Sequence, residues 1–234
     1  MDQNTFVEKL AQRGIELTPE QLDQFEKYYD ILVEWNQKMN LTAITDKEAV
    51  YLKHFYDSLT IAFDFDFTNQ KIVDVGAGAG FPSIPLKIAF PQLEVTIVDS
   101  LSKRITFLEH LFKELNLDKV KAVAARSEDY ASGHREQADI VMARAVARLN
   151  ILDELCLPLV KVGGHFLSLK GRQVNEEIEE ARHGITVLGG EIDSVVEFNL
   201  ANQDDLRGNI IIKKIKATPN KYPRQFGQIK KKPL

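Results

Sequence analysis

Apolar residues recur at helical spacing through the first 65 residues of the chain. After Thr18 they lie mostly three or four residues apart, at Leu22, Phe25, Tyr29, Leu32, Val33 and Met39. These positions form one stripe of a long helix. Capping boxes that begin at Thr5, Thr18 and Thr45 each predict a helix start, and Arg13-Gly14 predicts the end of the first helix. The pattern therefore predicts a helical extension over residues 1–65, with its third helix ending near Phe63.

From residue 71 onward, short strand-like runs alternate with helix-like segments. The expected strands are 71–75, 94–99, 120–124, 139–143 and 165–169, and the expected helices are 82–90, 102–116, 150–161 and 174–183. This alternation predicts parallel βαβ units. The strand patterns 195–198 and 210–213 are joined by a short polar loop, so they should pair antiparallel. The expected fold is α/β, a Rossmann-like seven-stranded sheet of five parallel strands plus an antiparallel edge hairpin.

Composition adds three limits to this picture. A chain of 234 residues with 44% hydrophobic positions suits one sizeable α/β domain with an appendage. The single cysteine, Cys156, excludes an internal disulfide and a CxxC metal site, and no metal is expected. No signal-peptide pattern and no bilayer-spanning apolar run are visible, so we expect a cytoplasmic protein without membrane contact.

The charge is distributed unevenly. The net charge is −4, yet residues 208–234 contain eight Lys or Arg and no Asp or Glu, which leaves −12 on residues 1–207. We therefore expect three parts: a helical extension over 1–65, a ligand-binding domain over 66–217, and a basic tail over 218–234. Such a tail either seeks a polyanion or only keeps the protein soluble.

A glycine-rich turn follows the first expected strand. Gly76, Gly78 and Gly80 alternate with alanines after Asp74-Val75, and Phe81-Pro82 comes next. Glycines let the main chain turn sharply and touch a flat polar ligand. The dinucleotide fingerprint would need a third glycine at position 81, and Pro82 removes an amide that a pyrophosphate would use. S-adenosylmethionine has no phosphate, and its amino-acid end needs only this turn and a carboxylate such as Asp74, so it fits better than a nicotinamide dinucleotide.

Three further strand ends should meet this turn at one edge of the sheet. Asp99 falls 23 residues after Gly76, where a carboxylate can accept hydrogen bonds from ribose hydroxyls. Ser127 and Glu128 could offer polar groups to a base edge, and Arg144 ends the fourth strand. The alternatives are an N-cap at Asp99, a solvated loop charge at Glu128 and a surface position for Arg144.

The acceptor of the methyl group is suggested by what the chain lacks. No Pro-Pro turn follows the fourth strand, and Cys156 falls inside an expected helix rather than near the turn. This favours an acceptor that is already nucleophilic, such as guanine N7, for which alignment matters more than acid–base catalysis. A small-molecule acceptor satisfies the same reasoning.

Several segments together resemble one bacterial family. VDVGAGAGFPSIPL, VTIVDSLSKRITFLEHL, ARAVARL, WNQKMNLTAIT and the closing KYPRQFG are similar to small-subunit ribosomal RNA methyltransferase G, also called glucose-inhibited division protein B. The resemblance implies a class I methyltransferase that methylates N7 of one guanine in 16S ribosomal RNA, presented as bare RNA or in the small ribosomal subunit. Nothing in the sequence demands more than a monomer. It also implies S-adenosylmethionine contacts at Gly76, Phe81, Ser127, Glu128 and Arg144. Relatives often carry Ala where this chain has Ser127.

The resemblance also suggests residues that face RNA. These are Asn40, His54, Lys103, Arg104, Arg126, Lys170, Lys221 and Arg224. Asn40 could instead be a helix C-cap, His54 a packed side chain, and Lys103 and Arg104 solvated charges. Three other functions remain open from the residues alone: a small-molecule methyltransferase, a non-catalytic ribosome-binding protein, and a nicotinamide oxidoreductase.

Overall fold

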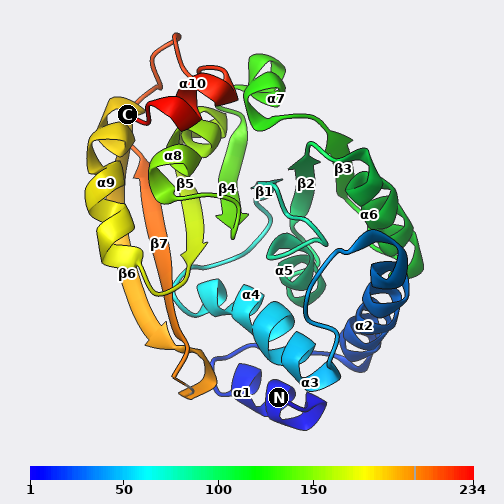
Figure 1. The fold of residues 1–234 in the computed structure, drawn as a ribbon. Coiled ribbons are helices and arrows are strands. Elements are labelled where there is room, and N and C mark those ends of the chain that lie inside the picture. Colours follow the sequence, from blue (N-terminus) through cyan, green and yellow to red (C-terminus); the bar gives the residue numbers. More distant parts are fainter. Residues whose placement is uncertain (203) are drawn as a thin grey trace.

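The computed structural model describes residues 1–202 and 204–234, and its centre is a seven-stranded mixed sheet (Figure 1). The strand order is β3-β2-β1-β4-β5-β7-β6. The strands are β1 (Lys71–Val75), β2 (Glu94–Asp99), β3 (Val120–Ala124), β4 (Ala138–Arg144), β5 (Val160–Lys170), β6 (Gly190–Asn199) and β7 (Leu206–Lys214). β1 to β5 pair in parallel, whereas β7 pairs antiparallel with both β5 and β6. The predicted fold class is confirmed.

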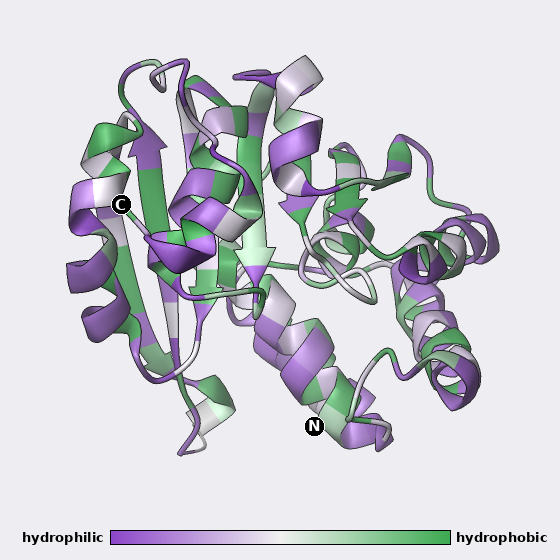
Figure 2. Cartoon of the chain, turned by 45° about the horizontal axis from the view of Figure 1, so that its top comes forward, coloured by the Kyte–Doolittle hydropathy of each residue, from purple (hydrophilic) through white to green (hydrophobic). Residues whose placement is uncertain are grey.

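Side chains alternate between the two faces of the sheet, as the strand geometry requires. Ile72 joins the apolar cluster on one face, and its neighbour Val73 joins the cluster on the other. The first face is covered by the helices of residues 1–63, together with α5 (Ser83–Ala89) and α6 (Ser102–Glu114). α7 (Ser127–His134), α8 (Leu149–Cys156), α9 (Val174–Val187) and α10 (Phe226–Lys231) cover the second. Figure 2 shows the hydrophobic strands between helices with polar outer faces.

The first 63 residues are helical, as expected, but two helix starts differ from the prediction. α1 (Gln3–Ala11) is capped by Asp2, whose side chain accepts from the N–H of Thr5, so the helix begins earlier than a Thr5 cap would allow. α2 (Pro19–Met39) has the predicted capping box at Thr18. Asp46, and not Thr45, caps α3 (Lys47–Val50), because its carboxylate accepts from the N–H of Ala49. A π-helical segment (Tyr51–Tyr56), α4 (Asp57–Leu59) and a 3-10 turn (Thr60–Phe63) follow.

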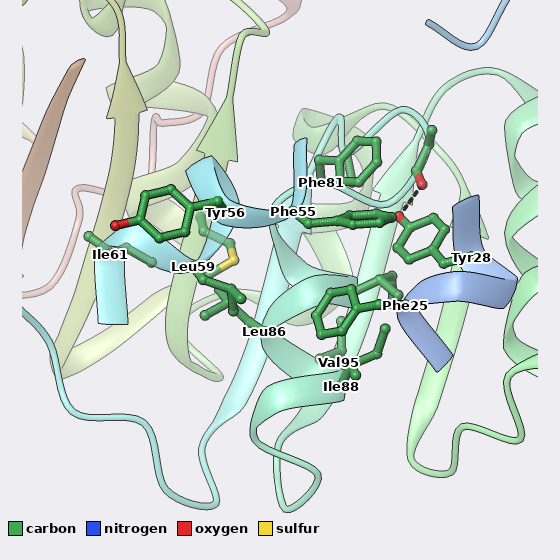
Figure 3. Close-up of a cluster of buried hydrophobic side chains, with 14 of the residues drawn as sticks. Phe25, Tyr28, Phe55, Tyr56, Leu59, Ile61, Phe81, Leu86, Ile88 and Val95 are labelled. Carbon is green, nitrogen blue, oxygen red and sulfur yellow. Dashed lines mark hydrogen bonds between the residues drawn. The ribbon is translucent and has the colours of Figure 1, made fainter. Parts of the chain in front are cut away.

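Aromatic side chains join the helical extension to the glycine turn (Figure 3). Tyr28 of α2 stacks on Phe81 with ring centroids 5.4 Å apart, and Phe55 lies 5.1 Å from Tyr28. The Tyr28 hydroxyl donates to the carbonyl of Ala79 at 2.6 Å, the dashed line in Figure 3. Because all three rings are buried, the extension and the sheet share one core. The helical extension is therefore packed against the domain and holds the glycine turn in place.

The C-terminal residues also pack against the domain. Tyr222 and Ile229 are buried in the cluster beneath α8 and α9, and Thr218 donates to the carbonyl of Leu188. Lys221 and Lys230 stay exposed. The segment 218–234, expected as a basic tail, is thus a docked strap with basic side chains on its outer side, and in Figure 1 its helix α10 lies beside α8. The sequence missed α7 and α10 because both are short.

No helix within the described residues is long and apolar enough to cross a bilayer.

Candidate functional site

A cavity of about 480 Å³ opens at the carboxyl ends of β1, β2, β3 and β4. Its lining residues are 41–42, 75–79, Phe81, 98–100, 125–128 and 144–146, together with His54, Arg104, Leu155 and Phe226; Gly80, predicted as a cofactor contact, does not border it. Its volume lies in the range of ordinary small-molecule sites. We call it the first cavity.

The three glycines of the turn adopt left-handed conformations for different local reasons. The φ angles of Gly76, Gly78 and Gly80 are 71°, 59° and 99°. A Cβ at Gly76 would lie 2.9 Å from Val146, and one at Gly80 would lie 2.7 Å from the Tyr28 hydroxyl. A Cβ at Gly78 would meet no atom within 4 Å, because that position borders the first cavity. The main chain at Gly78 is therefore open to a ligand, as a backbone cradle requires.

Asp99 lines the first cavity at the end of β2 and is 3% exposed. Its Oδ2 accepts from Arg104 Nη1 at 3.1 Å and from the N–H of Gly78 at 3.3 Å, and its Oδ1 accepts from the N–H of Leu101. The carboxylate thus joins the glycine turn to the start of α6. The N-cap residue of α6 is Leu101, so the alternative of an N-cap at Asp99 is wrong.

Asp74 lies behind the glycine turn and does not border the first cavity. It is fully buried; Oδ2 accepts from the N–H of Ser83 at 3.1 Å, and Oδ1 has no partner among the described residues. Burial raises the pKa of this carboxyl to about 7, against the opposing effect of the Ser83 hydrogen bonds. A direct contact between Asp74 and a ligand's amino group does not follow from this geometry.

Ser127 and Glu128 border the first cavity from the first turn of α7, where the sequence had suggested a loop. The Ser127 hydroxyl donates to the carbonyl of Leu155 at 2.6 Å. Glu128 is 8% exposed and accepts from the N–H of Phe226 at 3.3 Å, so it is not a solvated loop charge. Phe226 also lines the cavity, and no local pattern in the sequence predicts this, because Phe226 lies 98 residues after Glu128 along the chain.

Arg144 stands where the first cavity meets a second one. Its Nη1 donates to Asp57 Oδ2 at 2.8 Å, and its guanidinium lies 5.2 Å from the Phe81 ring. The His54 ring stacks on Phe81 with centroids 4.5 Å apart, its Nδ1 lies 3.3 Å from Arg144 Nη2, and its Nε2 lies 2.8 Å from Thr42 Oγ1. Burial and the charge of Arg144 lower the pKa of His54 to about 4, so its imidazole is neutral at physiological pH.

The second cavity, of about 400 Å³, contains a network of charges that the sequence did not reveal. It shares His54, Arg144 and Ala145 with the first cavity and is also lined by Lys53, Asp57, Lys170, Glu177, Arg207 and Asn209. Asp57 binds Arg144 through Oδ2 and Arg207 Nε through Oδ1 at 3.1 Å. Lys170 Nζ lies 2.7 Å from Glu177 Oε2, and burial lowers the pKa of its ammonium. Arg207 and Asp57 lie 150 residues apart, so no local pattern could pair them.

The other candidate RNA contacts occupy varied positions. Asn40 is the exposed C-cap of α2, with φ 50°. Lys103 is exposed on α6 beside Arg104, Arg126 is exposed beside Phe226, and Lys221 is exposed beside Tyr222.

Arg224 differs from this group. Its guanidinium binds Glu154, whose side chain is fully buried, through Nε at 2.9 Å and Nη2 at 2.6 Å. This ion pair gives Arg224 a structural role, and a contact between Arg224 and RNA stays a prediction.

No three His, Cys, Asp or Glu side chains among residues 1–202 and 204–234 gather as a metal ion would require. Cys156 is a buried free thiol whose pKa is raised by burial.

A sheet of this order with a glycine turn after β1 is the fold of class I methyltransferases. M. jannaschii TYW2 in complex with AdoMet has this fold, with a TM-score of 0.57, 16% identity, and coverage of 74% of this chain and 80% of that one. P. horikoshii TYW2 in complex with MeSAdo gives a TM-score of 0.54 at 14% identity, over 70% of this chain and 63% of that one.

Sequence comparison identifies the family. The model of the rRNA small subunit methyltransferase G family matches residues 21–206. Ribosomal RNA small subunit methyltransferase G of Bacillus cytotoxicus is 56% identical over 100% of this chain and 99% of its own length. The proteins of that name from Staphylococcus carnosus and Halalkalibacterium halodurans are each 57% identical, over 97% and 100% of both chains. The chain belongs to the rRNA small subunit methyltransferase G family. The predictions of a methyltransferase and of S-adenosylmethionine as its cofactor are confirmed.

Proposed function

We propose that this protein transfers the methyl group of S-adenosylmethionine to N7 of a guanine in 16S ribosomal RNA. The observation that carries the proposal is the pair of adjoining cavities that share Arg144. The first suits the cofactor, because its floor is bare main chain at Gly78 and a buried carboxylate, Asp99, stands beside it. The second cavity meets the first at Arg144, where we expect the methyl group to pass from the cofactor to its acceptor.

The second cavity has the charge of an RNA site. Lys53, Arg144, Lys170 and Arg207 line it against Asp57 and Glu177. Arginine and lysine side chains bind phosphates and donate hydrogen bonds to guanine O6. His54 is neutral there, with its ring held by Thr42 and Phe81. Such a cavity aligns a base that already has a free lone pair.

The mechanism needs no general base, since guanine N7 carries no proton. The cofactor supplies an electrophilic methyl group. The chain holds the cofactor through the glycine turn and Asp99, and Arg144 keeps a fixed orientation between Asp57 and the Phe81 ring. Fixing the two reactants in line and excluding water accounts for catalysis of this kind.

We also propose that the protein acts as a monomer in the cytoplasm, where ribosomal subunits are assembled. Among the described residues the large exposed apolar side chains are Leu101, Val146, Val162, Val195 and Ile215. They come from separate elements, and one of them, Val146, lines the first cavity. Sedimentation of the protein alone tests this proposal, and a stable dimer would contradict it.

The direct test of the function is transfer of labelled methyl groups to purified small subunits and to bare 16S RNA from cells lacking the gene. Nucleoside mass analysis should then find 7-methylguanosine at one position. Label on a small molecule with none on RNA would favour a small-molecule methyltransferase. RNA binding without any turnover would indicate a non-catalytic ribosome-binding protein. NADH binding in place of S-adenosylhomocysteine would indicate an oxidoreductase.

A further inference from the structure

The C-terminal strap forms one wall of the first cavity. Phe226 begins α10 and lines the cavity. Its N–H donates to Glu128 Oε1 at 3.3 Å, and its ring lies 6.0 Å from the guanidinium of Arg126. The strap therefore meets the first turn of α7 at the point where both border the space for the ligand.

Phe226 is held there by contacts that need no ligand. Two residues earlier, Arg224 donates to Glu154 from its backbone N–H at 2.7 Å as well as from its guanidinium. Opening this pair would leave the fully buried Glu154 carboxylate without a partner, which is strongly unfavourable. Tyr222 and Ile229 are buried on either side of Phe226 along the chain. The wall is thus preformed.

The position of the second cavity fixes which end of the cofactor lies near Phe226. The sulfonium must face the acceptor, so it lies toward Arg144 and Phe81, where the two cavities meet. Asp99 lies at the end of β2, the next strand of the sheet, and suits the ribose. The adenine is then left on the far side of Asp99, beside residues 125–128. Phe226 borders the cavity on that side.

We propose that Phe226 packs against the adenine of S-adenosylmethionine, so that the C-terminal strap is part of the cofactor site. This inference rests on the proposed methyl transfer. Aromatic rings pack on nucleobases with a substantial share of the binding energy. The strap, which the sequence presents as a polyanion-seeking tail, then has a second role that its basic composition conceals.

The test is calorimetric titration of Phe226→Ala, Phe226→Leu and wild type with two ligands, S-adenosylhomocysteine and 5′-methylthioadenosine. The second ligand keeps the adenine and ribose but lacks the amino-acid end. Phe226→Ala should weaken both by the same factor, about tenfold, and Phe226→Leu should weaken both by less. Lys230→Ala, an exposed change on the same helix, should leave both affinities unaltered.

Two results would overturn the inference: unchanged affinity in both Phe226 variants, or a loss confined to S-adenosylhomocysteine, which would place the ring at the other end of the ligand. Thermal unfolding without ligand shows whether the strap stays docked. If Phe226→Ala lowers the midpoint of thermal unfolding, an undocked strap would also weaken ligand binding. The affinities of Phe226→Leu, which keeps an apolar side chain against the domain, then decide the test. A wild type that binds neither ligand would refute the proposed function itself, whereas normal methyl transfer with unaltered Phe226 variants refutes only this inference.

Discussion

The two cavities that meet at Arg144 are built in different ways. The first is lined mainly by chain that directly follows strands, and its floor at Gly78 is bare backbone. The second is lined by charged side chains that orient one another, with Asp57 between Arg144 and Arg207. A site of bare main chain can therefore be encoded within a few residues, because backbone exposure is a local property. A site built on paired charges exists only once the chain has folded.

The largest effect that would separate the two cavities is expected from Gly78→Val. The branched side chain would occupy the first cavity, and φ 59° is unfavourable for Val, so we expect S-adenosylhomocysteine to bind at least about 100-fold more weakly. Affinity for RNA should change little, because the second cavity is untouched. Calorimetry measures the affinity for S-adenosylhomocysteine, and filter binding measures the affinity for RNA.

Gly163→Val is the matched control for Gly78→Val. Gly163 also has a left-handed φ, 88°, and open space around it, but it is exposed near the start of β5 and lines neither cavity. It should share the backbone strain without the loss of cofactor binding. If both variants bind the cofactor normally, the turn is not the cradle.

Asp57→Asn is expected to damage the second cavity and spare the first. It would leave the half-buried guanidinium groups of Arg144 and Arg207 without their shared carboxylate. We therefore expect the free energy of unfolding to fall by about 3 kcal/mol. Urea unfolding measures this loss, and methyl transfer should fall far more than cofactor affinity. Asp204→Asn, at a fully exposed carboxylate, should be neutral. Equal stability of the two variants would contradict the bridging role of Asp57.

A smaller effect concerns the wall behind the first cavity. The pKa of Asp74 is about 7 in the folded protein, above its ordinary 3.8, so the folded state binds the extra proton. The stabilisation is complete below the unfolded value and disappears as the pH rises through about 7. Relative to Asp74→Asn, the wild type should lose about 2 kcal/mol of unfolding free energy from about pH 5 to about pH 8. Urea unfolding across this range checks the sign, and a parallel pH dependence of the two proteins would contradict it.

The smallest expected effect concerns an exposed lysine at the start of α6. Lys103 is exposed at the start of α6, next to the Arg104 that binds Asp99. If it contacts an RNA phosphate, Lys103→Ala should reduce the slope of log affinity against log salt by about 1 and leave cofactor binding unaltered. Lys113→Ala, at the exposed far end of the same helix, is the control. Identical slopes would remove Lys103 from the RNA surface.

The strand pattern was readable because buried parallel strands are nearly continuous apolar runs between helices. The bounds of β1, β2 and β3 agree with the expectation residue for residue, whereas β5 and β6 extend several residues farther in their N-terminal direction. Two capping residues were misplaced, since Asp2 accepts from the N–H of Thr5 and Asp46 accepts from the N–H of Ala49, so that each helix begins at another residue than a threonine cap would set. The division at residues 65 and 218 stays a prediction, and apolar contacts cross both boundaries.

The sequence by itself determined the order of strands and helices, the glycine turn and the carboxylate that follows β2, because each depends on spacing within a short stretch of chain. Only the tertiary structure decided that Asp57 binds two arginines, that Arg224 neutralises a buried glutamate, and that Phe226 lines the first cavity. Those contacts join residues 70 to 150 positions apart. The sequence shows that these side chains are charged or aromatic, but only the packing of the folded chain decides which partners they contact.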